Sequence, residues 1–321
     1  MRRTACWFLL LGILCSTAAF ASATASRVEG PIKVDGVFDE ISKDDIRWSG
    51  SFVSASAAAE GKPKEVDVQT RFRVLYDDDA LLVQVECDEP NIDKIAAKYK
   101  EHDQDVYQDD CIELFMDPAG EGRYYHHFVI NTNGAWYDDY GADYGLVHAK
   151  LWDAPIEVAT KIDQAGKNWK AEVRIPFAAL TLRDDVKKDW LWNVTRERYA
   201  GGANELSTWS PLKGNFHAPK LFGKLTGVNV DFRRFNWSIG EPQIIVAGDG
   251  SGNSKLDMTV KVSNQSPQAR KVVVSAAPFG QKPAASAPAV DLAPGASADV
   301  TLPQFKIKAD IKTAAVQINV A

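Results

Sequence analysis

Short runs in which apolar and polar side chains alternate constrain the fold of this chain more than any other feature. In residues 111–116, Ile112, Leu114 and Met116 alternate with a cysteine, a glutamate and a phenylalanine. A period of two puts successive side chains on opposite faces of a β-strand. Many short strands with almost no helical pattern predict an all-β fold, with an antiparallel β-sandwich over residues 27–231. Similar runs, separated by turn signals, cover residues 66–76, 81–87, 125–131, 156–162, 169–175 and 190–198.

The composition changes in the last part of the chain. Residues 240–321 contain no Trp, Tyr or Cys and are rich in Ala, Val, Ser and Pro. Alternation continues there in Leu256, Met258, Val260 and Val262. We therefore predict a second, smaller immunoglobulin-like β-sandwich over residues 240–321, which serves as a spacer or as a docking unit.

The first residues have the pattern of a secretory signal peptide. A basic start precedes an apolar run at residues 7–20 that is too short to span a bilayer comfortably. Ala21 and Ala23 then satisfy the small-x-small rule for cleavage, with Ala23 and Ala25 as a second candidate. We predict a cleaved signal peptide over residues 1–23 and export to the periplasm or the extracellular space. No later segment is apolar enough to predict a transmembrane segment.

The charge balance narrows the classes of partner. The chain has 37 Lys and Arg against 43 Asp and Glu, which gives a formal net charge of −6 at pH 7. An acidic chain repels the phosphates of nucleic acids and of anionic membranes. The composition therefore favours a neutral ligand or a divalent cation and argues against nucleic acid as a partner.

Two cysteines, Cys87 and Cys111, lie beyond the predicted signal peptide. An oxidising compartment permits a disulfide between them. However, the alternation places Cys87 on a buried face and Cys111 opposite one, so only a bulge would let them meet. A disulfide and two buried thiols therefore remain alternatives. Neither cysteine belongs to a CxxC pair, which argues against a cysteine zinc site.

The strand at 111–116 also carries the first candidate for a binding site. Glu113 lies on the face opposite the aliphatic residues, and Tyr107 stands just before the strand. An aromatic-bearing loop at 216–223 offers Phe216. Sugar rings present C–H faces that stack on aromatic rings, and hydroxyls that bond to carboxylates. Two aromatic residues and a carboxylate therefore predict a sugar-binding cleft.

Further candidates surround this carboxylate. A strand carboxylate that its neighbours partly cover usually has a partner. Arg196 or Arg198 is the expected partner of Glu113, and the pair is either a buried structural ion pair or a ligand anchor. Trp209 either lines the cleft or holds the loop that carries Phe216.

A series of motifs runs in order through the first predicted domain. They are IKVDGVFDE at 32–40, LLVQVECDEP at 81–90, YQDDCIELF at 107–115, HFVIN at 127–131, AEVRIP at 171–176 and FG at 222–223. In order and spacing they resemble the family 9 carbohydrate-binding modules, which are part of a wider DOMON-like superfamily. The resemblance covers nearly all of the first domain and none of the second.

This resemblance implies a non-catalytic module that holds a terminal sugar between two aromatic rings. The two tryptophans of the family align with Tyr107 and Phe216, so stacking is expected with smaller rings. The carboxylate of the family aligns with Glu113. These three residues therefore form the centre of the expected site.

Two other features of the family are expected in altered form. An arginine of sugar-binding members falls at Val129, and His127 and Asn131, on the same face, are expected to supply hydrogen bonds in its place. Family members also bind structural calcium, for which the Asp-rich turns at 77–79 and 138–139 offer oxygen ligands. No other cofactor is expected.

We therefore predict an exported, non-catalytic protein that binds a poly- or oligosaccharide. The predicted ligand-binding residues are Tyr107, Glu113, His127, Asn131, Arg196, Trp209 and Phe216.

Two alternatives remain open. One is a haem-binding, DOMON-like electron-transfer domain that uses Met116, His126 or His127, although Met116 and His126 are predicted to face the core and no CxxCH site is present. The other is an accessory part of a glycoside hydrolase system in carbohydrate catabolism. Hydrolysis itself needs two carboxylates across a cleft, and no such pair stands out in the sequence.

Overall fold

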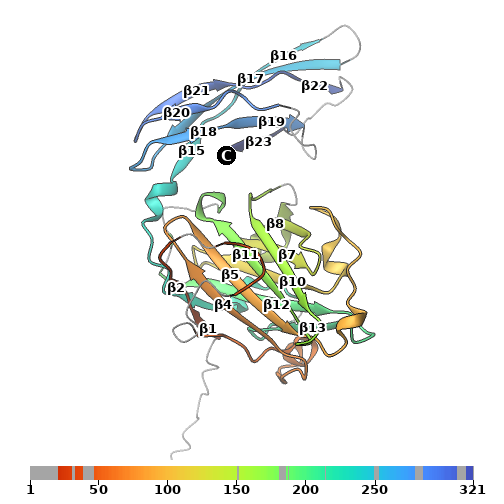
Figure 1. Cartoon of the computed structure of the whole chain (residues 1–321). Helices are drawn as coiled ribbons and strands as arrows, with labels where there is room; N and C mark the ends of the chain where they lie inside the picture. The colour runs from red at the N-terminus through yellow and green to blue at the C-terminus, as the bar shows by residue number, and fades with distance from the viewer. Residues whose placement is uncertain are drawn as a thin grey trace, which may run out of the picture.

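The computed structural model shows two β-sheet units that follow one another along the chain (Figure 1). The predicted signal peptide up to residue 20 lies outside the described residues. Within the described part of the chain, no helix is long and apolar enough to cross a membrane. The structure describes residues 21–30, 33–38, 47–149, 152–180, 186, 188–213, 215–248, 253–278, 285–308 and 316–320.

The first unit is a sandwich of two sheets. The larger sheet has the strand order β1 (Ser22–Thr24), β14 (Gly223–Thr226), β12 (Trp190–Arg198), β6 (Cys111–Asp117), β7 (Tyr125–Asn131), β8 (Trp136–Ala142) and β9 (Val147–Ala149), with β13 (Glu205–Thr208) beside β12 and β3 (Val53–Ser54) beside β13. The smaller sheet has the order β10 (Glu157–Asp163), β11 (Asn168–Pro176), β5 (Ala80–Asp88), β4 (Thr70–Tyr76) and β2 (Ser26–Arg27). Nearly all described pairings are antiparallel, so the prediction of an antiparallel all-β sandwich is confirmed.

Helical segments are short and lie in the connections. Helix α1 (Ala55–Ala59) begins after Ser54, whose hydroxyl accepts a hydrogen bond from the amide of Ala57. The remaining described helical segments are 3-10 turns, namely η1 (Ile92–Lys94), η2 (Val106–Gln108), η3 (Asp143–Gly145), η4 (Phe177–Ala179), η5 (Pro219–Leu221) and η6 (Phe232–Phe235).

The alternating residues explain how the two sheets hold together. Ile112, Leu114 and Met116 are fully buried in the main core, whereas Phe115 packs in a separate cluster on the other face of β6. Burying one large apolar side chain contributes about 1.5–3 kcal/mol. The core between the sheets also holds several large aromatic side chains, among them Phe72, Trp169, Trp190 and Trp192.

The first described strand is part of the sandwich. β1 pairs in parallel with β14, where Ala23 lies opposite Leu225. The side chains of Ala23 and Ala25 are each only 5% exposed and belong to the main core. Cleavage after Ala23, as predicted from the sequence, would therefore divide a strand of the folded protein.

Cys87 and Cys111 are free thiols, and both are buried. Cys87 on β5 faces the core between the sheets, whereas Cys111 on β6 packs against Val106 and Val129 on the other face. The two thiols lie on different faces because each strand keeps its alternation. Of the two alternatives left open by the sequence, the structure has the buried thiols.

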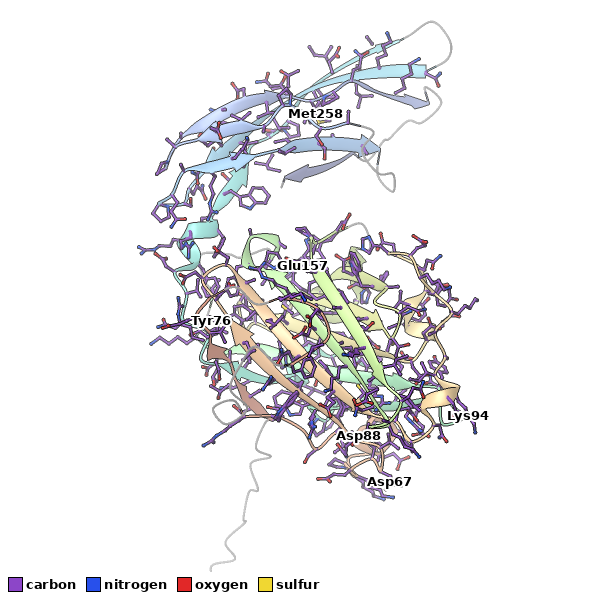
Figure 2. The ribbon with its side chains drawn as sticks, viewed as in Figure 1. Asp67, Tyr76, Asp88, Lys94, Glu157 and Met258 are labelled. Carbon is purple, nitrogen blue, oxygen red and sulfur yellow. The ribbon has the colours of Figure 1, made fainter. Side chains whose placement is uncertain are left out.

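The second unit has its own core. Met258, 1% exposed, lies in this core (Figure 2). On β16, by contrast, Ile244, Ile245 and Val246 are exposed. The immunoglobulin-like arrangement and the docking role stay predictions. The strands of this unit are β15 (Trp237–Ile239), β16 (Gln243–Gly248), β17 (Asn253–Asn264), β18 (Arg270–Val272), β19 (Val274–Pro278), β20 (Val290–Leu292), β21 (Ser297–Thr301), β22 (Phe305–Lys308) and β23 (Val316–Val320).

Candidate functional site

Polar side chains gather on the face of the larger sheet that points away from the core, which we call the outer face. Strand alternation puts Glu113 of β6 and His127 of β7 on this face, and His127 is paired with Asp139 of β8. The β6–β7 turn is fixed because the carboxylate of Asp117 accepts hydrogen bonds from three amides of the turn. The two hairpins therefore hold Glu113, His127 and Asp139 on adjacent strands.

Three of the five histidines of the chain meet on the outer face. His148 comes from β9 and His217 from the loop before η5. The ring centroids of His127 and His217 are 4.9 Å apart, and those of His148 and His217 are 4.5 Å apart. We call Glu113, His127, Asp139, His148 and His217 together the histidine cluster.

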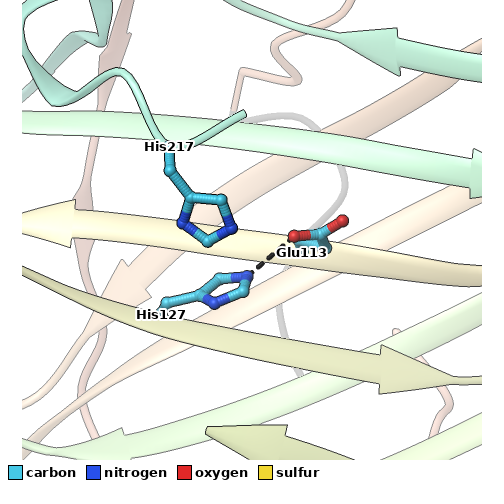
Figure 3. A group of neighbouring side chains, drawn as sticks. All are labelled: Glu113, His127 and His217. Carbon is cyan, nitrogen blue, oxygen red and sulfur yellow. Dashed lines mark hydrogen bonds and ion pairs between the residues drawn. The ribbon is translucent and has the colours of Figure 1, made fainter. Parts of the chain in front are cut away.

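His127 lies between two carboxylates. Its Nε2 is 2.7 Å from Oε2 of Glu113 (Figure 3), and its Nδ1 is 3.4 Å from Oδ2 of Asp139. Burial alone would lower the pKa of His127, but the hydrogen bonds and negative charges of Asp139 and Glu113 outweigh burial and raise the pKa to about 9. Glu113 and His127 are each only 3% exposed, so this charged group is shielded from water.

His217 is held from behind by a buried tyrosine. Its Nδ1 is 2.8 Å from the hydroxyl oxygen of Tyr125. Burial, and then the positive charges of His127 and His148, lower the pKa of His217 to about 3, so this ring is neutral at pH 7. Gly141 leaves room for this arrangement, because a β-carbon at that position would overlap the ring of Tyr125.

Tyr107 connects the cluster to the surface. It lies in η2, and its side chain is 40% exposed. Its ring centroid is 6.5 Å from that of Tyr137, which in turn lies 6.3 Å from that of His127. The structure therefore brings three of the predicted residues, Tyr107, His127 and Glu113, to one surface, with Tyr137 between them.

The two other predicted aromatic residues are buried. Phe216 is 8% exposed and packs with Leu212 and Phe222 in an apolar cluster. Trp209 is 6% exposed, and its ring lies 5.1 Å from that of Phe72 in the main core. Neither ring is available for stacking on a ligand, because both are buried; next to Phe216, His217 joins the histidine cluster instead.

The predicted ion pair between Glu113 and Arg196 or Arg198 is wrong. Arg196 is the cross-strand partner of the core residue Ile112, so it points between the sheets. Its Nη2 lies 3.0 Å from Oε2 of Glu89, and Nε of Arg198 lies 2.7 Å from the same oxygen. The partner of Glu113 is His127.

Asn131 has a structural role. Its amide nitrogen donates hydrogen bonds to the carbonyl of Tyr99 and to Oδ2 of Asp109, each at 2.9 Å. Its amide oxygen accepts hydrogen bonds from the amides of Asn133 and Ala135. These bonds fix the segment that leads into η2, and so they position Tyr107 without leaving Asn131 available to a ligand.

Sequence reasoning missed four residues of the outer face, namely Tyr137, His148, Glu197 and His217, and considered Asp139 only as a calcium ligand. Glu197 accepts a hydrogen bond from the hydroxyl of Tyr199 at 3.0 Å. Burial, and then the negative charge of Glu113, raise the pKa of Glu197 to about 7. The chain has only five histidines, and three of them converge here, so each histidine was worth considering as a site residue.

The residues considered for haem lie on two faces of one sheet. Met116 and His126 are cross-strand partners, both buried, as predicted, on the core side. His127 lies on the outer face. Because β-strand alternation separates these side chains, they do not converge on one iron atom.

The Asp-rich segments considered for calcium already bind donors of the protein, and residues 138–139 lie within strand β8, so the prediction of a turn there is wrong. Oδ1 of Asp77 accepts hydrogen bonds from the amides of Asp79 and Ala80. The two carboxylate oxygens of Asp138 bond to His102 and to the amide of Ala154. Structural calcium stays a prediction.

A surface depression of about 800 Å³ lies elsewhere on the first unit, beside helix α1 and β13. Its walls include Ser54, Lys64, Glu65 and Leu206, and none of its lining residues is aromatic. A sugar would find no stacking surface there, so the outer face is the better candidate.

Comparisons with known proteins agree with the observed fold. The family model described as carbohydrate-binding family 9 matches residues 64–226. A proposed carbohydrate-binding protein from Bacteroides uniformis ATCC 8492 is similar in fold, with 17% identity, a TM-score of 0.53, and coverage of 65% of this chain and 100% of that chain. No curated protein matches the chain.

Two further solved structures are family 9 carbohydrate-binding modules from Caldicellulosiruptor kristjanssonii. One is in complex with glucose, with 18% identity, a TM-score of 0.46, and coverage of 65% of this chain and 99% of that chain. The other is in complex with cellotriose, with 18% identity, a TM-score of 0.46, and coverage of 65% and 95%.

Proposed function

The chain belongs to carbohydrate-binding family 9, and from this premise we propose that it binds a poly- or oligosaccharide on the outer face, as a non-catalytic binding protein. The first unit carries this function because the family match lies within it. The second unit would then act as a spacer or docking unit.

One observation supports the outer face above all. Tyr107 exposes an aromatic ring next to Tyr137, on the same face as Glu113 and His127. The tyrosine rings offer stacking surface for the C–H face of a sugar ring. Beneath them, Glu113 offers a carboxylate acceptor for hydroxyl groups, and His127, which bonds to Glu113 and Asp139, orients that carboxylate. Phe216, Trp209, Arg196 and Asn131 are not part of this proposed contact surface.

Replacing Tyr107 by alanine tests this proposal. The variant loses the exposed stacking ring, so its affinity for saccharide should fall by about 1 kcal/mol, or roughly fivefold. Isothermal titration calorimetry against a panel of oligosaccharides that includes glucose and cellotriose measures the change. Trp237, 43% exposed on β15 of the second unit, provides the matched control, and Trp237→Ala should bind as wild type does.

Two outcomes would count against the proposal. Wild-type protein that binds nothing in the panel would remove carbohydrate binding itself. Unchanged affinity in Tyr107→Ala, together with a loss in Trp237→Ala, would move the site to the second unit.

The proposal includes export, with a cleavage position that preserves β1. Ala19 and Ala21 also satisfy the small-x-small rule, and cleavage after Ala21 leaves Ser22–Thr24 intact. Mass spectrometry of protein exported from a bacterial host should therefore find Ser22 as the first residue. A mature chain that begins at Thr24 or Ser26 would show that β1 is not needed in the folded protein.

A further inference from the structure

We propose that Glu113, His127 and His217 together bind one divalent transition-metal ion of the zinc class on the outer face. This site goes beyond saccharide binding and rests on the geometry of the three side chains alone. The cluster draws its ligands from β6, β7 and the loop before η5, as Figure 3 shows.

The three ligand atoms already lie close together. One atom from each residue falls within 4.8 Å of the other two. Ligand atoms around a tetrahedral zinc ion are about 3.3 Å apart, since each bond is about 2.0–2.1 Å long. The pair formed by His127 and Glu113, at 2.7 Å, would therefore open by about 0.6 Å, and the ligand atom of His217, within 4.8 Å of both, would adjust to the same spacing. Small rotations of the His217 side chain, which is only partly buried, supply this movement.

The second ring nitrogen of each histidine already has a partner that orients the ring. Nδ1 of His127 faces Oδ2 of Asp139, and Nδ1 of His217 faces the hydroxyl of Tyr125. Nε2 of each ring is therefore the proposed ligand atom, and Nε2 of His127, now 2.7 Å from Oε2 of Glu113, would release its proton to solvent as the ion binds. Histidines that bind metal ions usually donate their other N–H to a carboxylate or another oxygen in this way, which fixes the tautomer and the ring orientation.

The donor set selects the class of ion. Two imidazole nitrogens and one carboxylate oxygen suit zinc and neighbouring transition ions, whereas calcium and magnesium prefer sites made of oxygen alone. Three protein ligands leave a fourth position for water or for an oxygen of a bound molecule. Glu113 and His127 are 3% exposed, so the ion would lie at the bottom of the surface that Tyr107 borders.

Zinc titration of tag-free, chelator-treated full-length protein tests the site. Calorimetry should find one ion per chain with a dissociation constant at or below about 1 μM. X-ray absorption of the zinc-loaded wild type should then show two imidazole ligands and oxygen at about 2.0–2.1 Å. Absence of micromolar binding, or a spectrum without imidazole, would overturn the proposal, and neither measurement depends on a variant.

His217→Gln should weaken zinc binding by about a hundredfold, because the ion loses one of its three protein ligands. The control is His102→Gln, because His102 belongs to a different group with Asp138 and Asp153 and should leave zinc binding unchanged. Equal binding by wild type and His217→Gln, or loss of binding in His102→Gln, would place the ion elsewhere and contradict the proposal.

The same variants test the metal proposal and the saccharide proposal independently of each other. Tyr107→Ala should bind zinc as wild type does while it loses saccharide affinity. Saccharide titrations with chelator present show whether carbohydrate binding stands without the ion. Failure of zinc binding with intact saccharide binding would overturn the metal site alone.

Discussion

Replacing Glu89 by alanine should lower the free energy of unfolding by about 3–5 kcal/mol, because it leaves two buried guanidinium groups without their shared carboxylate. Glu89 is fully buried, and Arg196 and Arg198 are 1% and 5% exposed. Arg196 also donates to the backbone oxygen of Asp88 at 2.9 Å, so this group links β12 of one sheet to the end of β5 in the other. Loss of the carboxylate would therefore destabilise the contact between the sheets.

Urea unfolding of wild type and Glu89→Ala measures this loss. Arg233→Ala is the control, because it removes an ion pair with Asp231 that is exposed on both sides, and no measurable shift of its midpoint is expected. An equal effect of both substitutions, or a Glu89→Ala protein as stable as wild type, would show that the buried group contributes little.

The stability of the protein at acidic pH provides an independent test of the buried group formed by Glu89, Arg196 and Arg198. Burial alone would raise the pKa of Glu89, but the hydrogen bond from Arg198 and the charges of both arginines lower it below the usual 4.5. The carboxylate therefore contributes stability above pH 4.5, and this contribution is lost as the pH falls through the lower pKa of the folded state. The difference in stability between wild type and Glu89→Ala should narrow in acid.

Replacing Glu113 by glutamine should reduce saccharide affinity by about 10- to 100-fold. A hydrogen bond to a charged group contributes about 1.5–3 kcal/mol, and each 1.4 kcal/mol corresponds to about tenfold in affinity. Glutamine keeps the size of the side chain but removes the charge that orients His127 at 2.7 Å. Calorimetry with the saccharide bound by wild type measures the effect.

Glu65→Ala is the matched control for this substitution. Glu65 is an exposed carboxylate that lines the depression beside α1, so its removal should leave affinity unchanged if the outer face is the site. A larger loss in Glu65→Ala than in Glu113→Gln would instead locate the saccharide in the depression.

Strand alternation was enough to predict the all-β fold and the face on which Glu113 lies. Ile112 and Leu114 make one face of β6 clearly apolar. The residues that alternate with them, including Glu113, must therefore lie on the opposite, outer face. Alternation is harder to read at residues 195–198, Thr-Arg-Glu-Arg, because both faces of this part of the strand carry polar side chains. The buried residues Trp192 and Val194 earlier in β12 do place Arg196 on the core side, but the sequence pattern does not identify its partner, Glu89, which is distant in the chain.

The loop that carries Phe216 shows a second limit. A loop has no period, so sequence alone does not decide which of two neighbouring residues points inward. The ring of Phe216 is buried in the apolar cluster that includes Phe115 and Phe222, whereas His217 joins the histidine cluster. Four members of the histidine cluster lie on the consecutive strands β6, β7, β8 and β9, within residues 113–148, and His217 joins them from a loop that is distant in the chain.

A crystal structure of the protein with its saccharide tests the central proposal most directly. We expect one sugar ring against Tyr107 and a hydroxyl oxygen within hydrogen-bond distance of the Glu113 carboxylate. A saccharide bound in the depression beside α1 or on the second unit, with the outer face free of sugar, would contradict it.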